Sequence, residues 1–191
     1  GVPIVGVTLL HRRGYFVQEL DDRGEQTEHP ASWSVEDYAR ELPGRASIEL
    51  EGRTVLIRAW CREINGVSGF CIPVLFLDTL LEENAAEDRA LTGTLYGGDG
   101  LYRLRQEAVL GIGGVRMLRA LGCTKIERFH MNEGHAALLA VELQRESEDE
   151  PASAADHMAL DEVRQKCVFT THTPVPAGHD RFSRDLVTRA L

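Results

Sequence analysis

Two short stretches decide the fold: FHMNEGH at residues 129–135 and VFTTHTP at residues 168–174. In each, an apolar run typical of a β-strand ends abruptly at polar residues and histidine, and a helical pattern soon follows. If both strands lie in one parallel sheet, the polar residues after them meet at its carboxyl edge, where α/β proteins bind their ligands. We therefore expect a ligand site at this edge.

The alternation of strands and helices around these stretches predicts an α/β fold with a parallel sheet core. Apolar runs at residues 4–10 and 15–20 predict two strands joined by a polar turn. Residues 46–51, 54–62 and 70–77 predict three further strands. Because glycine-containing turns separate these three, we expect an antiparallel β insertion near residues 46–77.

One long helix is predicted from residue 101 to about residue 121, with Gly122 as its C-cap. Gly111, Gly113 and Gly114 lie inside it, and each costs a helix about 1 kcal/mol relative to alanine. Glycines retained at this cost indicate that the helix closely approaches a strand or a ligand.

The remaining segments are polar connections and short elements. Residues 25–44 are expected to be a loop with one short helix at 35–41, residues 78–89 an acidic solvated connection, and residues 146–156 a mobile acidic surface loop. The patterns further predict a strand at 125–129, a helix at 135–144, a helix near 160–165, a strand at 167–170 and a helix from residue 180 onward.

Composition narrows the class of protein. The 191 residues are 43% hydrophobic and carry a formal net charge of -9, which disfavours non-specific binding to nucleic acid or anionic membranes. No apolar run approaches the roughly 18 residues that span a bilayer. Four cysteines form no C-x-x-C pair, so we expect reduced thiols and a cytoplasmic protein. Because the chain starts without methionine and stops within a helical pattern, we interpret it as a single partial domain of a longer protein.

His130, Glu133 and His135 are candidate metal ligands, but their H-x-x-E-x-H spacing differs from H-E-x-x-H, where both histidines share one helix face. Three interpretations follow from residue type: a metal site, strand-end polar groups satisfied within the fold, or hydrogen bonding to carbohydrate or phosphate. We expect no metal here.

His172 has rigid neighbours, because Pro174 biases Thr173 toward an extended backbone and β-branched threonines flank the histidine. The glycine-rich segment at residues 97–100 has neither P-loop nor dinucleotide-binding spacing. It is either a plain turn or a gate loop in which Asp99 accepts hydrogen bonds from sugar hydroxyls.

With these residues assembled, the chain resembles the α-glucan phosphorylases, the glycogen, starch and maltodextrin phosphorylase family, in their shorter bacterial and archaeal form. The similarity lies in five blocks that follow the family order from end to end: GVPIVGV at 1–7 with RGYF at 13–16, PV at 73–74 with LDT at 77–79, LYGGD at 95–99 with RLRQE at 103–107, and the two junctions at 130–135 and 170–178.

This resemblance implies part of the Rossmann-like amino-terminal domain of a two-domain GT-B enzyme. The implied reaction is phosphorolysis of the terminal glucose of an α-1,4-glucan, with retention of configuration, to give glucose 1-phosphate. Pyridoxal phosphate would take part through its phosphate group. The implied partners are the glucan, phosphate and the remainder of the same polypeptide.

The resemblance assigns site residues position by position. His172 matches the catalytic histidine that contacts the glucose at the cleavage site, and Thr171 beside it replaces an asparagine. Glu133 and His135 match sugar-side hydrogen-bonding positions. Gly97, Gly98 and Asp99 match the gate loop beside the glucose, where Gly100 replaces an asparagine common in long-form members.

No residue of this chain matches the cofactor-binding lysine or the phosphate-binding groups of the family. Lys125 and Lys166, the two lysines present, lie in other blocks. We therefore expect the chain alone to be inactive and to bind no cofactor. The alternatives are a GT-B glycogen or starch synthase that uses a nucleotide sugar, which would lack the YGGD and RLRQE block, and a non-catalytic glucan-binding module.

Overall fold

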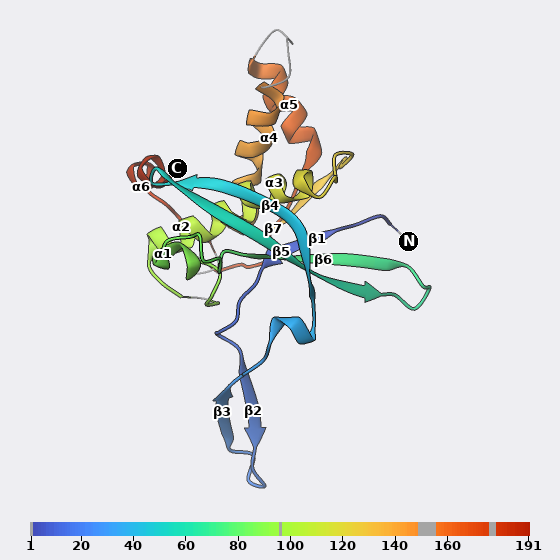
Figure 1. The fold of residues 1–191 in the computed structure, drawn as a ribbon, viewed down its shortest axis with the longest axis vertical. Coiled ribbons are helices and arrows are strands. Elements are labelled where there is room, and N and C mark those ends of the chain that lie inside the picture. The colour runs from blue at the N-terminus through green and yellow to red at the C-terminus, as the bar shows by residue number, and fades with distance from the viewer. Residues whose placement is uncertain (1, 96, 149–155, 176–178) are drawn as a thin grey trace.

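A four-stranded mixed sheet lies at the centre of the computed structural model, which describes residues 2–95, 97–148, 156–175 and 179–191 (Figure 1). Its strand order is β1–β6–β5–β4. The strands are β1 (Gly6–Leu9), β4 (Arg40–Leu50), β5 (Arg53–Asn65) and β6 (Cys71–Asp78). β1 runs parallel to β6, whereas β5 pairs antiparallel with both of its neighbours.

The antiparallel strands were predicted correctly, but not their place in the fold. They form the central sheet itself and not an insertion into a parallel core. Tight connections at residues 51–52 and 66–70 join β4 to β5 and β5 to β6, and such hairpins can link only antiparallel strands. A parallel pair does occur in a separate two-stranded sheet of β7 (Phe129–Asn132) and β8 (Cys167–Thr170).

The long helix predicted from residue 101 is present as a helical run with a π-turn in its middle. It consists of α2 (Gly100–Ala108), η2 (Val109–Gly113) and α3 (Gly114–Ala120). A Cβ atom at Gly113 would lie 2.4 Å from Ile57 Cδ1, and one at Gly111 would lie 2.7 Å from the backbone nitrogen of Leu139. The expected close approach to a strand is therefore confirmed. Gly122 has a φ of 81°, as its expected C-cap position requires.

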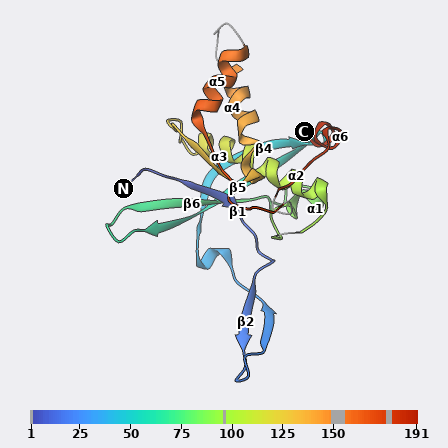
Figure 2. The ribbon, with the colours of Figure 1, turned by 180° about the vertical axis from the view of Figure 1, so that it is seen from behind.

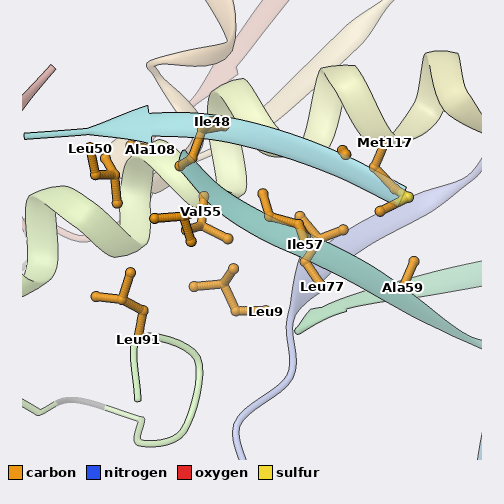
Figure 3. Packing of buried hydrophobic residues seen from close by; sticks show 12 residues of the cluster. Leu9, Ile48, Leu50, Val55, Ile57, Ala59, Leu77, Leu91, Ala108 and Met117 are labelled. Carbon is orange, nitrogen blue, oxygen red and sulfur yellow. The ribbon is translucent and has the colours of Figure 1, made fainter. Parts of the chain in front are cut away.

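The main hydrophobic core lies between the central sheet and this helical run (Figure 3). Val55, Ile57 and Ala59 alternate along β5 toward the helices, and all three are fully buried. Ala108 and Met117 meet them from the helical run. The inward-facing side chains of β5, which recur every two residues, thus pack against the apolar face of the 101–121 helical run.

A second apolar cluster connects this layer to β7 and to α4 (Leu139–Glu148) and α5 (Asp156–Lys166). Val115 and Leu118 from α3 pack there with Phe129, Leu143 and Val163. In both views α4 and α5 lie side by side and project from the central layer (Figures 1 and 2). The second cluster thereby fixes β7 relative to the central layer.

Residues 25–44 are not the loop that we predicted. β2 (Phe16–Leu20) pairs with β3 (Gln26–Pro30) in a hairpin that projects away from the body, η1 (Val35–Asp37) follows, and β4 already begins at Arg40 (Figure 1). Asp21 closes the hairpin by accepting the backbone N–H groups of Arg23 and Glu25. The two strands predicted at residues 4–10 and 15–20 are present as β1 and β2, and they belong to different sheets.

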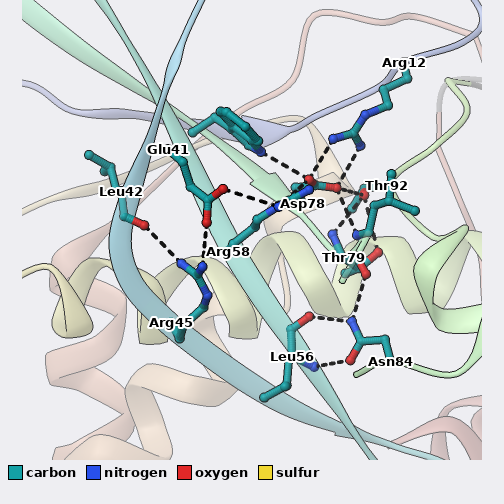
Figure 4. A network of polar contacts seen from close by, with 12 residues as sticks. Arg12, Glu41, Leu42, Arg45, Leu56, Arg58, Asp78, Thr79, Asn84 and Thr92 are labelled. Atoms are coloured by element: carbon teal, nitrogen blue, oxygen red, sulfur yellow. Dashed lines mark hydrogen bonds and ion pairs between the residues drawn. The ribbon is translucent and has the colours of Figure 1, made fainter. Parts of the chain in front are cut away.

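The acidic connection predicted at residues 78–89 is partly buried, not solvated. Asp78 is fully buried and accepts hydrogen bonds from Arg12, Arg58 and the indole N–H of Trp60 (Figure 4). Burial alone would raise the pKa of Asp78, but the guanidinium groups and the Leu80 N–H outweigh it and hold that pKa well below its usual range. The segment ends in the short helix α1 (Ala86–Arg89).

The last third of the chain agrees with prediction except at element boundaries. β8 has the predicted bounds and α5 contains the predicted helix, but the predicted strand at 125–129 begins only at Phe129. The predicted helix at 135–144 becomes η3 (Gly134–Ala136) and then α4. The helix expected from residue 180 is α6 (Arg184–Ala190).

Most of the predicted acidic loop at 146–156 lies outside the described residues, as do Gly1, Tyr96 and residues 176–178 of the motif blocks. Within the described ranges, no helix combines the length and the apolar character needed to cross a membrane.

Candidate functional site

The two polar junctions lie side by side at the carboxyl ends of β7 and β8. The strands are parallel and in register from the pair Phe129–Cys167 to the pair Asn132–Thr170. One step further, the Glu133 N–H donates to the Thr170 carbonyl at 2.8 Å. The expectation that both junctions share one edge of a parallel pair is confirmed.

Glu133 holds the loop that follows β8. Its Oε1 accepts the backbone N–H groups of His172 and Thr173, each at 2.8 Å, and its Oε2 accepts the Thr171 hydroxyl at 3.2 Å. The side chain is only 5% exposed. These hydrogen bonds, led by that from His172, lower the pKa of Glu133 to about 2 although burial works in the opposite direction. The carboxylate is therefore ionised at neutral pH and fixes the backbone on both sides of the His172 peptide.

The backbone of Glu133 adopts an unusual conformation, with φ 62° and ψ -166°. This region is almost exclusive to glycine, and a residue with a Cβ occupies it only where its surroundings enforce it. Here two sets of hydrogen bonds hold Glu133 in this conformation. Its backbone N–H donates to the Thr170 carbonyl, and its side chain accepts hydrogen bonds from residues 171–173. The strained residue lies at the point where β7 turns away from β8.

The His172 imidazole is held at both nitrogens. Nδ1 lies 3.1 Å from Glu133 Oε1, and Nε2 lies 2.7 Å from Asn132 Oδ1. The side chain is nevertheless 59% exposed, so the ring is fixed in orientation while its surface is open to a ligand. Among the described residues, none donates a hydrogen bond to the His172 carbonyl oxygen.

His130, Glu133 and His135 do not converge on one point. His130 Nε2 lies 2.6 Å from the Thr170 hydroxyl, and Glu133 faces residues 171–173. His135 Nδ1 instead lies 3.9 Å from Glu107 Oε1 on α2. Each of the three residues therefore contacts a different partner, and their side chains do not form one site.

A cavity of about 240 Å³ lies between α2, the segment after β1 and η3, next to the junctions. Its polar lining includes Arg103, Glu107, His135 and Asp180. Arg103 Nε donates to Asp180 Oδ2 at 3.0 Å. Burial, followed by the negative charge of Asp180 and a hydrogen bond with it, raises the pKa of Glu107 to about 7, against the opposing effect of Arg103. The cavity thus contains a carboxyl group that titrates near neutrality.

The glycine-rich segment begins α2. Asp99 is the N-cap, and its Oδ1 accepts the Tyr102 N–H at 2.9 Å. Gly98 has a φ of 80°, and a Cβ there would lie 2.4 Å from the Tyr102 ring, so only glycine fits. Gly97 is less confined, because a Cβ there would lie 3.2 Å from the Thr94 Cγ2 methyl group. No hydrogen bond between described residues joins Gly97, Gly98 or Asp99 to the His172 loop.

Four polar residues of this region were not predicted as site residues: Asn132, Arg103, Glu107 and Asp180. Asn132 could have been found, because it ends the same strand that positions Glu133 and a parallel register sets it beside Thr170. Glu107 and Asp180 are 73 residues apart and meet only through the packing of α2 against the segment before α6. No local pattern signals that contact.

Polar groups gathered beyond the ends of two adjacent parallel strands are typical of the ligand sites of α/β proteins. No protein-family model matches the sequence. Glycogen phosphorylase of Mycobacterium tuberculosis is 40% identical over an alignment 205 residues long, which covers 99% of this chain and 23% of that protein. Maltodextrin phosphorylase of Thermococcus litoralis is 35% identical over 95% of this chain and 22% of that protein. Glycogen phosphorylase of Aquifex aeolicus is 29% identical over 92% of this chain and 25% of that protein.

The chain is therefore homologous, over nearly its whole length, to one region of the glycogen and maltodextrin phosphorylases. It spans about a quarter of the length of these relatives. The resemblance that the motifs predicted is confirmed at the level of the family.

Proposed function

We propose that this chain forms the sugar-side wall of the active site of an α-glucan phosphorylase. In that reaction phosphate attacks the anomeric carbon of the terminal glucose of an α-1,4-glucan, the glycosidic bond to the rest of the glucan breaks, and glucose 1-phosphate and the shortened glucan are released. The observation that carries the proposal is the exposed His172, oriented by Asn132 and Glu133, in a chain homologous to phosphorylases. We propose His172 as the catalytic residue of this wall.

The open groups of the His172 loop suit a sugar. The His172 carbonyl, to which no described residue donates, is able to accept a hydrogen bond from a sugar hydroxyl, and the imidazole face is able to cover the apolar side of a pyranose ring. The ionised Glu133, whose Oε1 lies 3.1 Å from Nδ1 of the His172 imidazole, favours positive charge that develops nearby during bond cleavage. Glu133 and Thr171 therefore act through the position of His172, whereas His135 and Asp99 are proposed to hydrogen-bond sugar hydroxyls directly. Gly97 and Gly98 are proposed to let the backbone approach the sugar.

Pyridoxal phosphate, the cofactor implied by the family, does not fit the lysines of this chain. Lys125 precedes β7 and Lys166 precedes β8, so both lie at the amino ends of the strands, and they line the same surface hollow. His172 lies at the opposite, carboxyl ends. We propose that the cofactor and the phosphate are bound by another part of the polypeptide.

The cofactor proposal has a direct test. After incubation with pyridoxal phosphate and removal of the excess, the purified 191-residue chain is expected to show no absorbance from bound cofactor, with a complete phosphorylase as positive control. A stable absorbance band that disappears in Lys125→Ala or Lys166→Ala would contradict the proposal.

The catalytic proposal is tested in the polypeptide that carries this segment. Phosphate-dependent release of glucose 1-phosphate from maltodextrin is expected, and His172→Ala should lower kcat/KM by roughly 100-fold or more, the size of losing one preorganised transition-state contact. His29→Ala, an exposed histidine on the β2–β3 hairpin, is the matched control and should be unchanged.

Two other outcomes of these experiments would identify one of the alternative functions. Glucan extension from a nucleotide sugar without phosphate would identify a synthase. Maltodextrin binding by the 191-residue chain, with no turnover by the polypeptide that carries it, would identify a glucan-binding module.

A further inference from the structure

The face of the central sheet that is turned away from the helical run, here called the outer face, is apolar at one end. Side chains of β5 alternate between the two faces, and the helical run packs only against the other one. On the outer face Trp60 pairs with Phe76, and Ile64, which is 52% exposed, pairs with Ile72. Figures 1 and 2 show α3 and α4 on one side of the sheet and the β2–β3 hairpin on the other. At the apolar end of the outer face, the described chain adds only the short segment around η1, with Val35 in its cluster.

The outer face is polar at its other end, where β4 pairs with β5. Arg45, Glu49 and Thr54 lie on the outer face there, and all three are exposed. Polar side chains of this kind are usual where one face of an antiparallel sheet is in contact with water. The apolar end departs from this pattern and is typical of a surface that another element covers.

A hollow of about 370 Å³ opens at the apolar end, between the sheet and the segment around η1. The aromatic rings of Tyr15, Trp33, Tyr38 and Phe76 line it. Tyr38 is 55% exposed, and its ring lies edge-on to that of Trp33 with 6.0 Å between the ring centroids. Tyr15 also lines the cavity of about 240 Å³ beside η3. The hollow and the candidate functional site thus share one side chain in their walls.

Arg62 is the charged residue in the lining of this hollow. Its guanidinium carbon lies 5.7 Å from the centroid of the Tyr38 ring. Among the described residues no carboxylate forms an ion pair with it, and the adjacent Glu63 pairs with Arg40 instead. A surface that covers the hollow would therefore be complementary in charge if it carried a carboxylate opposite Arg62.

We propose that the apolar end of the outer face is the docking surface for an amphipathic helix from another part of the same polypeptide. Apolar side chains of that helix fill the hollow, and a carboxylate at its edge pairs with Arg62. An apolar sheet face must be buried against another element, and in α/β folds that element is usually a helix. Because Tyr15 is shared, the docked helix also fixes one wall of the cavity beside η3.

The length of the relatives supports this occupant. The chain spans about a quarter of the glycogen and maltodextrin phosphorylases to which it is homologous, so most of their sequence has no counterpart in it. A segment of the same polypeptide reaches the hollow at an effective concentration on the order of 1 mM, whereas a second copy has only its bulk concentration. The proposal rests on this homology and not on the reaction proposed for His172.

The test is hydroxyl-radical footprinting of the unmodified polypeptide that carries this segment, read by mass spectrometry. Glucan and phosphate are left out, so the result does not depend on catalysis. We expect the oxidation rates of Tyr38 and Ile64, each relative to the free amino acid, to fall to the level of the buried Trp60. Val67, which is fully exposed at the turn between β5 and β6, is the matched control and should be oxidised at the rate of an exposed residue.

Three results would overturn the proposal. Oxidation of Tyr38 and Ile64 as ready as that of Val67 would show that the hollow stays open. Protection that is lost when the protein is diluted would assign the surface to a second copy. Protection that appears only when maltodextrin is added would assign it to a sugar.

Two variants of Arg62 test the chemistry of the occupant in the same polypeptide. Arg62→Glu should restore the oxidation of Tyr38, because it places two negative charges opposite each other, whereas Arg62→Lys should keep the protection. Arg40→Glu, at an exposed arginine on β4, is the matched control and should also keep it. Trp60 should stay protected in every variant and thereby reports that the sheet is intact. Equal protection of Tyr38 in Arg62→Glu and in the unmodified polypeptide would contradict a carboxylate opposite Arg62.

Discussion

At the scale of single residues, Glu133 combines two properties that oppose each other energetically. Its backbone occupies a region that costs a non-glycine residue on the order of 1–3 kcal/mol. Its side chain accepts two backbone N–H groups and one hydroxyl from residues 171–173. A glycine would relieve the backbone strain but could not form these side-chain hydrogen bonds, so the glutamate is needed to hold the loop that carries His172.

These two effects can be separated with two variants. Glu133→Ala loses the side-chain hydrogen bonds and keeps the strain, whereas Glu133→Gly loses the same bonds and relieves the strain. Glu133→Gly is therefore expected to be the more stable of the two in urea denaturation. In both, the amides of His172 and Thr173 should exchange faster with solvent than in the unmodified chain.

Two results would contradict this account: equal stability of the two variants, or unchanged exchange at His172. Glu127→Ala, an exposed glutamate in the segment before β7, is the control and should alter neither measurement. Protonation of Glu133 in acid is expected to weaken the same hydrogen bonds that Glu133→Ala removes. Because the folded pKa of Glu133 is about 2, the protection of these amides is present above pH 4.5 and lost as pH falls toward 2.

At the scale of elements, the helical run α2–η2–α3 is positioned by glycines of unequal importance. A Cβ at Gly113 would overlap Ile57 Cδ1 at 2.4 Å. A Cβ at the next residue, Gly114, would meet Val7 and Leu77 at ordinary contact distances of 3.5 and 3.7 Å. The helix therefore touches the sheet at Gly113.

We expect Gly113→Ala to destabilise the fold by about 1–3 kcal/mol, the usual cost of overpacking a core. Gly114→Ala is the matched control one residue away and should be neutral or stabilising by up to about 1 kcal/mol, because alanine favours a helix. Urea denaturation of both variants measures the difference. Equal stability of the two would show that Ile57 moves aside without cost.

Elements with a clear hydrophobic period could be predicted from the sequence, and elements held by distant polar partners could not. The 101–121 helix carries such a period and β8 is a short apolar run, and both were predicted nearly to the residue. β3 has the sequence QTEHP, which offers no apolar alternation, and its pairing depends on β2 and on the turn at Asp21. The burial of Asp78 depends on Arg12 and Arg58, which lie 66 and 20 residues away.

The same distinction applies to the candidate site. The pairing of the two junctions followed from the α/β pattern and from the rule that parallel strands share a carboxyl edge. The contact of Glu107 with Asp180 could not be predicted, because it depends on how α2 packs against a segment without regular structure.

At the scale of the whole molecule, stability is distributed unevenly. The central sheet and the helical run share a core of fully buried side chains, whereas every residue of β2 and β3 is exposed (Figures 1 and 3). A two-stranded hairpin without a packed face is marginally stable in water. Phe16, Val17 and Leu20 remain accessible to solvent on this hairpin.

The hairpin is expected to open independently of the body. Hydrogen exchange should show amides of β2 and β3 exchanging orders of magnitude faster than those of β5, since local opening there breaks few buried contacts. β5 is the internal control, because it pairs on both sides. Exchange of the hairpin as slow as that of β5 would mean that its strands unfold only with the whole chain.

The hydrogen bonds of Glu133 have a further consequence for the order of folding. They join residues 39 and 40 positions apart, and no local turn can bring these residues together. The chain must first close a long loop that contains α4 and α5, at an entropic cost that local contacts do not share. The His172 loop therefore gains its folded position only when β8 pairs with β7. Under the proposed function, competence to bind the sugar would be acquired in the same kinetic step as the long-range topology.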